Sequence, residues 1–456
     1  MMVRGPRPRD VPRPGGTLAF GLFILLNVVL LIRPADVFPP LFGLPIYQAC
    51  ILACLAVALP AVSRMLEREG LAAEPISLCM VGLLGAVALS HLSHGRIDEA
   101  VSDSWEFAKL LIYQVLLISL VNTPRRLRVF LGCLSALIVA HTALAVMQYH
   151  RMIDLPAMAA MSERYLDPES GEWTTKVRLR GGGIFGNPND MSRLLTIGII
   201  LSLYWLGDRG PLVLRLVWLA PLTLCGYALT QTFSRGGFIG LVVGLLVLFR
   251  AAFGTRKALL LSAVALPALF VLSAGRQTDI STSEGTGQLR VRFWSEGFTA
   301  MQEVPVFGIG SNQYVEVTSR HQEAHNSFVH AFVELGLLGG ILFAGAFYFA
   351  MRFPGWLDRS RVGPPNRDLQ RARPYLLGII AGYAVGLLSS SRVYAPTTYV
   401  LLGLMAVWIR LSLPRDTFLP APLRFVGGRL AGRLVVVGLA CLVVLYTYTR
   451  FAVRWS

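Results

Sequence analysis

The sequence has few charged residues for its length, and it has no pattern typical of a soluble enzyme or of a metal site. Only 15% of its 456 residues are charged, whereas 54% are hydrophobic and the mean hydropathy is +0.58. An ordinary soluble domain carries roughly 25% charged residues. No CxxC pair, HExxH motif or pair of catalytic carboxylates is present in a recognisable context. The composition therefore excludes a soluble cytosolic enzyme, a disordered chain and a secreted disulfide scaffold.

The six cysteines all lie inside apolar blocks, at positions 50, 54, 79, 133, 225 and 441. We interpret them as small buried hydrophobic residues and predict neither a disulfide nor a bound metal. The N-terminal segment is basic and rich in proline, and no convincing small-residue cleavage site follows the first apolar block. We therefore expect that block to be a retained membrane span rather than a signal peptide.

Apolar blocks long enough to cross a membrane recur along the chain, and they predict an all-α, polytopic transmembrane helical bundle. The pattern gives about 12–13 spans, of which 107–122 and 396–412 are the shortest. The predicted spans are 17–33, 42–63, 77–93, 107–122, 127–147, 191–207, 211–231, 236–252, 257–274, 327–350, 374–392, 396–412 and 431–449.

The distribution of arginine orients the bundle. Arginines gather in the N-terminal tail, at 125–128, at 351–373, where there are six, and at 409–433, where there are five. Because positive residues prefer the cytoplasmic side, the N-terminus is predicted to lie inside. The net charge of +16 then reflects cytoplasmic loops, and we expect no nucleic acid partner.

This orientation places the two long connections outside, and connections of such length are usually functional. The predicted organisation has six parts in chain order. They are a basic cytoplasmic tail (1–16), spans one to five (17–147), a first outer loop (148–190), spans six to nine (191–274), a second outer loop with an amphipathic helix (275–326) and the C-terminal spans (327–456).

A first candidate cluster, RLRGGGIFGNPND (178–190), lies where the first outer loop enters a span. Its glycines match GxGxxG, but no βαβ unit surrounds them, so a dinucleotide site is not expected. Asn187 or Asn189 is suited to cap the helix, with Pro188 in its first turn. The helix start would offer free N–H groups to an anion, and Arg180 would add a bidentate phosphate donor. A plain capped helix start is an equally open interpretation.

A second cluster, QTFSRGG (231–237), forms a short outer connection. A lone arginine on the outer face is unusual, since positive residues prefer the inside. We favour a functional role for Arg235 over snorkelling toward lipid headgroups. Gly236, Gly240 and Gly244 repeat every four residues, which favours close helix packing.

The third cluster extends from Arg290 to Gly340. Residues 291–301 are typical of an amphipathic helix on the outer surface, with Trp294 at the membrane interface. His330 and Glu334 share a helix face, and for His330 we favour a structural pairing. His325 precedes the next span at its water-facing mouth. A histidine there, with an ordinary pKa near 6.5, suits a base toward a hydroxyl, while outward arginines would hold a phosphate.

The three clusters together resemble the O-antigen ligase and O-antigen polymerase superfamily of bacterial inner-membrane glycosyltransferases. In the third cluster, the matching residues are RFWSEGFTAMQEVPVFGIGSNQY, followed by AHNSFVHAFVELGLLG. The resemblance implies a metal-independent enzyme without a cofactor, whose two outer loops are periplasmic. Its donor would be a glycan on undecaprenyl pyrophosphate, and membrane lipids would surround it. The acceptor would be a sugar hydroxyl, on lipid A core for a ligase or on another lipid-linked glycan for a polymerase.

The resemblance also implies roles for particular residues. The catalytic residues would be His325 as the base, with Arg180 and Arg235 as pyrophosphate ligands. The register also allows Arg178 in place of Arg180. Further substrate contacts would come from Arg178, Arg292, Trp294, Asn326 and Glu334.

Three readings of function remain open. O-antigen ligation to lipid A core is placed first, followed by an O-antigen or exopolysaccharide polymerase of the same superfamily. A transporter or flippase of an anionic lipid-linked substrate is the third, and it would usually show broken helices or charges near mid-membrane. In one respect the sequence departs from the superfamily, for which about twelve spans with both ends inside are expected. Thirteen spans put the C-terminus outside.

Overall fold

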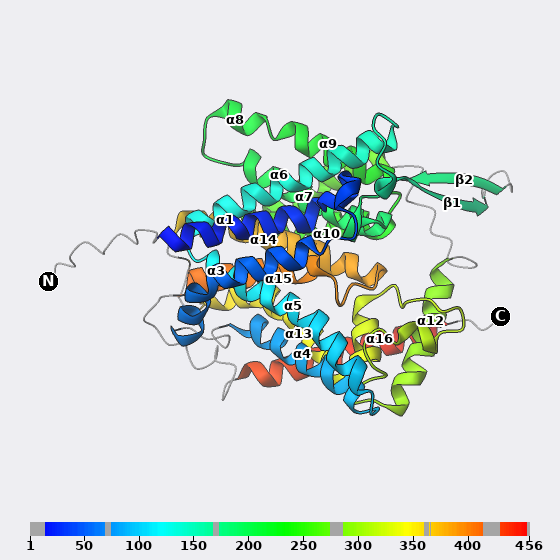
Figure 1. The fold of residues 1–456 in the computed structure, drawn as a ribbon. Helices are drawn as coiled ribbons and strands as arrows, with labels where there is room; N and C mark the ends of the chain where they lie inside the picture. Colours follow the sequence, from blue (N-terminus) through cyan, green and yellow to red (C-terminus); the bar gives the residue numbers. More distant parts are fainter. Residues whose placement is uncertain are drawn as a thin grey trace.

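The protein is an almost entirely helical bundle, as the sequence predicts (Figure 1). The computed structural model describes residues 14–68, 74–166, 173–273, 286–359, 364, 366–413 and 429–453. The predicted basic tail up to residue 13, part of the second outer loop (274–285) and residues 414–428 of the basic segment 409–433 lie outside the described residues.

Each of the thirteen predicted spans coincides with a helix. The helices are α1 (Pro14–Ile32), α3 (Ile46–Arg68), α4 (Pro75–Leu92), α5 (Ile97–Leu120), α6 (Pro124–Tyr149), α7 (Pro188–Leu206), α9 (Leu219–Gln231) with the short α8 (Leu212–Leu216) before it, α10 (Arg235–Phe253), α11 (Thr255–Ser273), α13 (Ser327–Arg359), α14 (Arg367–Gly386), α15 (Pro396–Ser412) and α16 (Arg429–Ala452).

Membrane character is clear for most of these helices. Within the described ranges, eight are long and apolar enough to cross a membrane, and α1 and α15 are shorter apolar helices. The predicted spans outside both groups are α5, α7 and α11. Helices α5 and α7 start with charged turns that contain Asp98 and Asp190. Helix α1 begins and α16 ends at opposite ends of the bundle (Figure 1), which is the arrangement that thirteen spans would produce.

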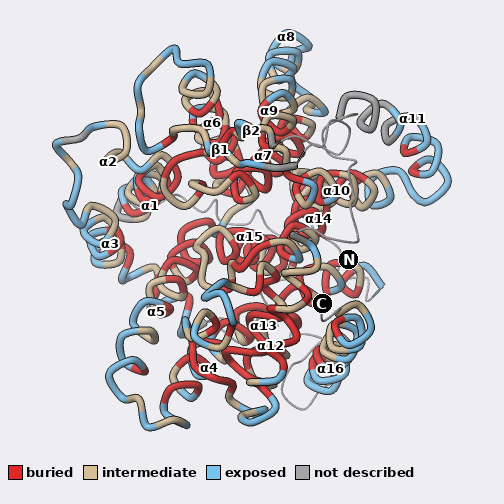
Figure 2. Tube along the Cα trace, turned by 90° about the vertical axis from the view of Figure 1, so that its right-hand side faces the viewer, coloured by how far each residue is buried: buried red, intermediate tan, exposed pale blue. Residues whose placement is uncertain are grey.

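The two long connections gather at one end of the bundle, on the right of Figure 1, which we call the loop end. The first connection holds an antiparallel hairpin of β1 (Met161–Leu166) and β2 (Trp173–Arg178), with Met161 opposite Arg178. This hairpin was not expected from the sequence. Seen from the loop end, buried residues of α7, α13, α14 and α15 fill the interior, whereas α3, α8 and α11 lie at the rim (Figure 2).

Helix α12 (Thr286–Glu303) confirms the amphipathic helix predicted in the second connection. Its apolar face is covered by other helices, however. Trp294, Phe298 and Met301 pack into a cluster with residues of α13 and with Cys441 and Leu445 of α16. The expected interfacial position of Trp294 is therefore wrong, because α13 and α16 supply the apolar partner that a membrane would have supplied.

Helices α10 and α14 approach closely along the glycine repeat of α10. A Cβ added to Gly240 would lie 2.7 Å from the carbonyl oxygen of Gly382, and one added to Gly244 would lie 2.9 Å from that of Gly378. Both distances are shorter than a carbon side chain tolerates. The predicted packing role of this repeat is thus confirmed, and the contact fixes the start of α10 at the loop end.

Helix α13 is broken at Gly336, whose φ of 63° and ψ of −163° are not helical. The segment before it in the chain pairs with the freed backbone groups. Gly310 N–H donates to Glu334 O at 3.0 Å, and Leu337 N–H donates to Pro305 O at 2.8 Å. A broken helix was expected of a transporter. Here the break is closed by protein backbone, which satisfies the polar groups that the break exposes.

Replacement of Gly336 by alanine should destabilise the protein strongly. Its φ/ψ region is almost restricted to glycine, and the new Cβ would lie 2.4 Å from Val306 O. We expect a loss of about 3 kcal/mol in unfolding free energy, measured as a lowered midpoint of thermal unfolding in detergent micelles. Gly355→Ala in the same helix is the control, because nothing lies within 4 Å of its Cβ position. An equal effect of both substitutions would contradict this account of the break.

Candidate functional site

Arg178 stands at the end of β2 and joins three parts of the loop end. Its Nη1 donates to Glu163 Oε2 at 2.8 Å, its Nε to Thr232 O at 2.9 Å and its Nη2 to Asn189 Oδ1 at 3.3 Å. The hairpin, the start of α7 and the connection before α10 are therefore held together by one guanidinium group.

Arg235 is the first residue of α10. Ser234 caps this helix, since its Oγ accepts from Gly237 N–H at 3.1 Å and donates to Asn189 Oδ1 at 2.8 Å. The Arg235 side chain is exposed, and no hydrogen-bond partner for it is found among the described residues. A helix N-terminus adds positive potential beside this charge.

Arg290, on α12, completes a group of three arginines. Burial lowers the pKa of Arg290, and the positive charges of Arg178 and Arg235 lower it further, against the attraction of Glu163. Like charges brought together in a partly buried place repel one another. A bound anion would relieve that repulsion, so the arrangement suits a multiply charged anionic ligand such as a phosphate group.

Asp190 and Arg392 form a second group of charges at the loop end. Asp190 is 5% exposed, accepts from Arg392 Nε at 2.7 Å, and forms further ion pairs with Arg392 and Arg193. The backbone N–H of Arg392 donates to Ser327 Oγ at 2.9 Å. This network connects the start of α7, the turn between α14 and α15, and the start of α13.

His325 interacts electrostatically with both groups of charges, through Arg290 and through Arg392 and Asp190. Its backbone has a φ of 50°, and its N–H donates to Ser391 Oγ at 3.0 Å. Burial lowers the pKa of the imidazole to about 4, and the charges of Arg290 and Arg392 act in the same direction. The ring is therefore neutral at neutral pH and has a free lone pair to accept a proton.

Arg180 has different surroundings from those predicted. Its Nε donates to Ala159 O at 2.5 Å and its Nη1 to Gly186 O at 3.2 Å, so it ties the glycine-rich turn to the first loop. Arg178 is the residue that interacts with Arg290. The geometry thus favours the competing register. Asn187 caps α7, with its Oδ1 accepting from Asn189 N–H at 2.8 Å, as the first cluster suggested.

Two of the expected substrate contacts are buried within the protein. Trp294 Nε1 donates to Ala324 O at 2.6 Å, which holds the loop just before His325. Glu334 is fully buried, and its carboxylate accepts from Asn312 N–H at 3.0 Å, Tyr314 N–H at 2.9 Å and Tyr394 Oη at 2.7 Å. Both side chains hold the loops in place and do not reach the solvent.

His330 Nε2 lies 2.9 Å from Glu334 Oε1, so the structural pairing predicted for His330 is confirmed. Asn326 caps α13, since its Oδ1 accepts from Phe328 N–H at 3.0 Å and Val329 N–H at 3.2 Å, while its buried amide nitrogen has no partner among the described residues. Arg292 is partly exposed on α12.

Two residues of the site were not identified as such from the sequence, Arg290 and Arg392. Asp190 appeared in the first cluster but received no role. An arginine on the outer side between two spans was the signal that singled out Arg235, and Arg392 carries the same signal. Across the described ranges, no group of three or more His, Cys, Asp or Glu side chains is arranged to hold a metal ion.

Fold and site together describe a polytopic helical protein with a group of three arginines and a neutral histidine at one end. Residues 220–344 match the sequence model of the family described as O-Antigen ligase. The match extends from α9 to α13 and contains Arg235, Arg290 and His325. The match covers little more than a quarter of the chain. It supports the predicted resemblance to the O-antigen ligase superfamily and a membrane glycosyltransferase of the O-antigen ligase or polymerase type. No curated protein matches the chain.

Proposed function

We propose that this protein transfers a glycan from undecaprenyl pyrophosphate to a sugar hydroxyl, most simply from O-antigen donor to lipid A core, on the periplasmic side of a bacterial inner membrane. The observation that carries the proposal is the group of Arg178, Arg235 and Arg290 beside a neutral His325, inside or next to the matched segment. The arginine distribution along the sequence supports a periplasmic position for this end.

The chemistry requires two roles that these residues can fill. The acceptor hydroxyl attacks the anomeric carbon of the donor, and the bond from that carbon to the pyrophosphate oxygen breaks. The departing oxygen takes the electron pair, and fixed arginines stabilise the charge that develops on it. The Nε2 or Nδ1 lone pair of His325 takes the hydroxyl proton. We assign the pyrophosphate to Arg235, Arg290 and Arg178, with Arg180 holding the turn beneath them.

Donor binding also changes the basicity of His325. Its pKa is lowered by burial and by Arg290 and Arg392. A bound pyrophosphate would offset those positive charges and so raise the pKa of the histidine. The base becomes stronger only when the donor is in place, which discourages proton transfer in the empty site.

The pH profile tests this coupling. The neutral imidazole is the active form, so kcat/KM should fall as the pH drops through about 4, the pKa of His325 in the free protein. The acid limb of kcat should lie at higher pH, because kcat reports the donor complex. Arg290→Gln should move the acid limb of kcat/KM upward, since it removes a charge that lowers the pKa. Identical acid limbs near the ordinary value of 6.5 would contradict the coupling.

Deletion of the gene in its host, followed by gel analysis of surface lipopolysaccharide, tests the function. Loss of long glycan from lipid A core, with accumulation of lipid-linked polymer, would support ligation. Single repeats attached to core would instead support polymerase activity. The proposal would be overturned if the deletion left the lipopolysaccharide ladder unchanged and no other surface polysaccharide was lost in the deletion strain and restored by the wild-type gene. Complementation with His325→Ala should fail although the variant protein is present in the membrane, which separates loss of catalysis from loss of the protein.

A further inference from the structure

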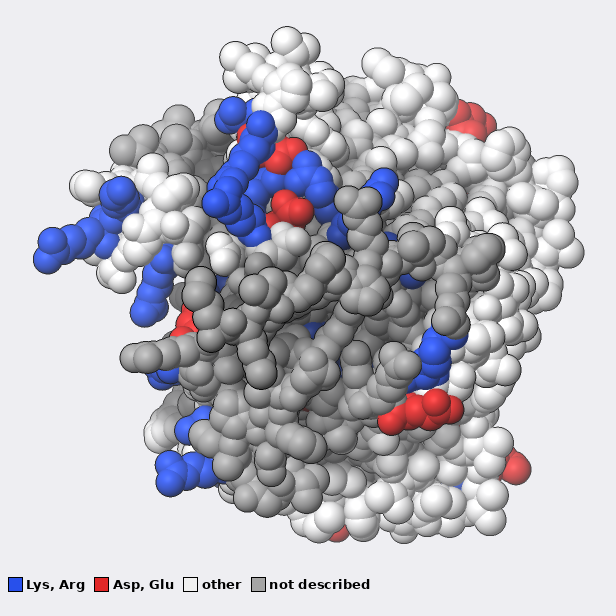
Figure 3. Space-filling model, turned by 90° about the vertical axis from the view of Figure 1, so that its left-hand side faces the viewer, with Lys and Arg blue, Asp and Glu red and all other residues white. Residues whose placement is uncertain are grey.

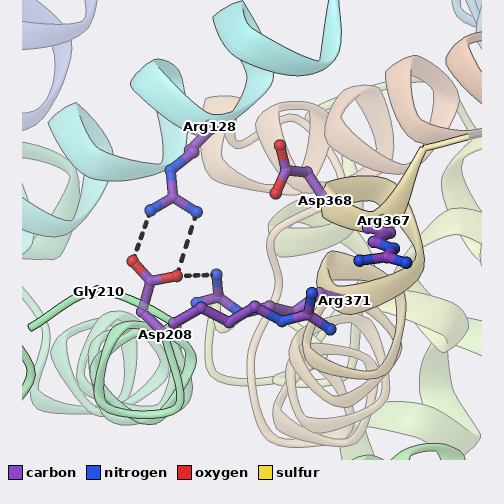
Figure 4. Close-up of a pocket in the computed structure, with 7 residues that line it drawn as sticks. Arg128, Asp208, Gly210, Arg367, Asp368 and Arg371 are labelled. Atoms are coloured by element: carbon purple, nitrogen blue, oxygen red, sulfur yellow. Dashed lines mark hydrogen bonds and ion pairs between the residues drawn. The ribbon is translucent and has the colours of Figure 1, made fainter.

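A second charged site lies at the end of the bundle opposite the loop end. It is a cavity of about 290 Å³ between the starts of α6 and α14 and the turn after α7 (Figure 4). Figure 3 shows this end of the molecule, where basic side chains gather around acidic ones. The cavity is lined by Arg128, Asp208, Arg209, Gly210, Arg367, Asp368 and Arg371.

Two of its arginines are held rigidly. Arg128 contacts Asp208 with both terminal nitrogens, at 3.3 and 2.5 Å, and its guanidinium lies 5.1 Å from the ring centre of Trp205. Arg371 also pairs with Asp208, donates to Tyr204 O at 2.5 Å and stacks on the Tyr204 ring at 4.1 Å. The carboxylate of Asp208 is therefore shared by two cations, and the buried Nε of Arg371 has no partner in the described structure.

The other two arginines carry uncompensated charge. Arg209 and Arg367 are exposed, and the described residues provide neither with an ion pair. Four arginines and two aspartates leave the lining with a net charge of +2. Guanidinium groups converging on one cavity match the geometry of a phosphate.

An apolar surface continues directly from the cavity. Gly210 of the lining is followed by α8, where Leu212, Val213 and Leu214 are 61, 73 and 64% exposed. A ligand that fills the cavity and covers this surface has an anionic head and an apolar tail. Free phosphate would use only the first of these features.

We propose that this cavity binds the phosphate headgroup of an anionic phospholipid, whose acyl chains lie along α8. The arginine distribution predicts that this end faces the cytoplasm, where the leaflet surface is anionic and basic pockets between helices suit such headgroups. The site is separate from the candidate catalytic site and does not depend on the proposed function.

The full-length protein in nonionic detergent should retain phosphatidylglycerol in native mass spectrometry, with phosphatidylcholine and soluble glycerol phosphate as comparison probes. We expect much stronger retention of phosphatidylglycerol than of either comparison probe. Arg209→Gln and Arg367→Gln should each weaken it about fivefold, the effect of one basic residue near an anionic lipid surface. Leu214→Asn should weaken lipid binding and leave glycerol phosphate binding unchanged.

Arg256→Gln is the matched control, because Arg256 is an exposed arginine at the start of α11 and does not line the cavity. It should retain the lipid fully. All of the substituted residues are exposed, so an unchanged thermal unfolding midpoint will show that the variants fold. Equal binding of phosphatidylcholine, tight binding of glycerol phosphate without the lipid, or equal loss in Arg256→Gln would each overturn the proposal.

Discussion

His325→Ala should lower glycan transfer by about 10²- to 10⁴-fold, the usual contribution of a positioned general base. The imidazole is neutral, partly buried and close to the arginines that would hold the leaving group. Its removal leaves no proton acceptor at that position, while donor binding by the arginines is retained. The measurement is the transfer rate of purified protein at saturating donor, so that kcat rather than KM carries the loss.

His321→Ala provides a closely matched control. His321 lies in the same loop, has the same φ of 50° as His325 and is exposed. Both substitutions therefore impose the same backbone cost, and only one removes the proposed base. Equal losses in the two variants would mean that loop conformation, and not proton transfer, explains the effect.

Arg235→Gln should lower transfer by about 10²- to 10³-fold, as expected when one donor to a developing negative charge is lost. The side chain is exposed at the start of α10, so the protein should stay folded and in the membrane. Arg235→Lys should recover little activity if the guanidinium binds the phosphate through two nitrogens, because an ammonium group cannot reproduce that geometry.

Arg320→Gln is the control for this prediction, since Arg320 is an exposed arginine of the second loop. It should transfer at the wild-type rate. Retention of full activity by Arg235→Gln would remove Arg235 from the site. Arg180→Gln should reduce activity together with thermal stability, because Arg180 holds the carbonyl groups of Ala159 and Gly186.

The helices could be predicted from the sequence because a membrane span leaves a long and simple apolar signal. The same holds for the cap at Asn187 and for the glycine repeat on α10, which depend on neighbours close in the chain. The hairpin of β1 and β2 was missed. Each strand has only six residues, and so short an alternation is weak evidence in a loop.

The details of the site depend on contacts between distant segments, which a single sequence does not reveal. Arg290 and Arg292 differ by two positions on α12 and so point to different sides of the helix. Only the packing of α12 on α13 and α16 decides which one meets Arg178. The Asp190–Arg392 pair joins residues 202 positions apart. Glu334 matches a family pattern in the sequence. Its hydrogen bonds with the backbone N–H groups of Asn312 and Tyr314 depend on how the second loop folds, which the sequence alone does not show.

Reconstituted transfer tests the central claim most directly. The purified protein in proteoliposomes would be supplied with a glycan on undecaprenyl pyrophosphate and with lipid A core as acceptor, and both products would be quantified. The account predicts glycosylated acceptor and released undecaprenyl pyrophosphate in equal amounts, with His325→Ala failing and His321→Ala succeeding. The account would be contradicted if folded wild-type protein left the donor unconsumed both with lipid A core as acceptor and with a second lipid-linked glycan as acceptor.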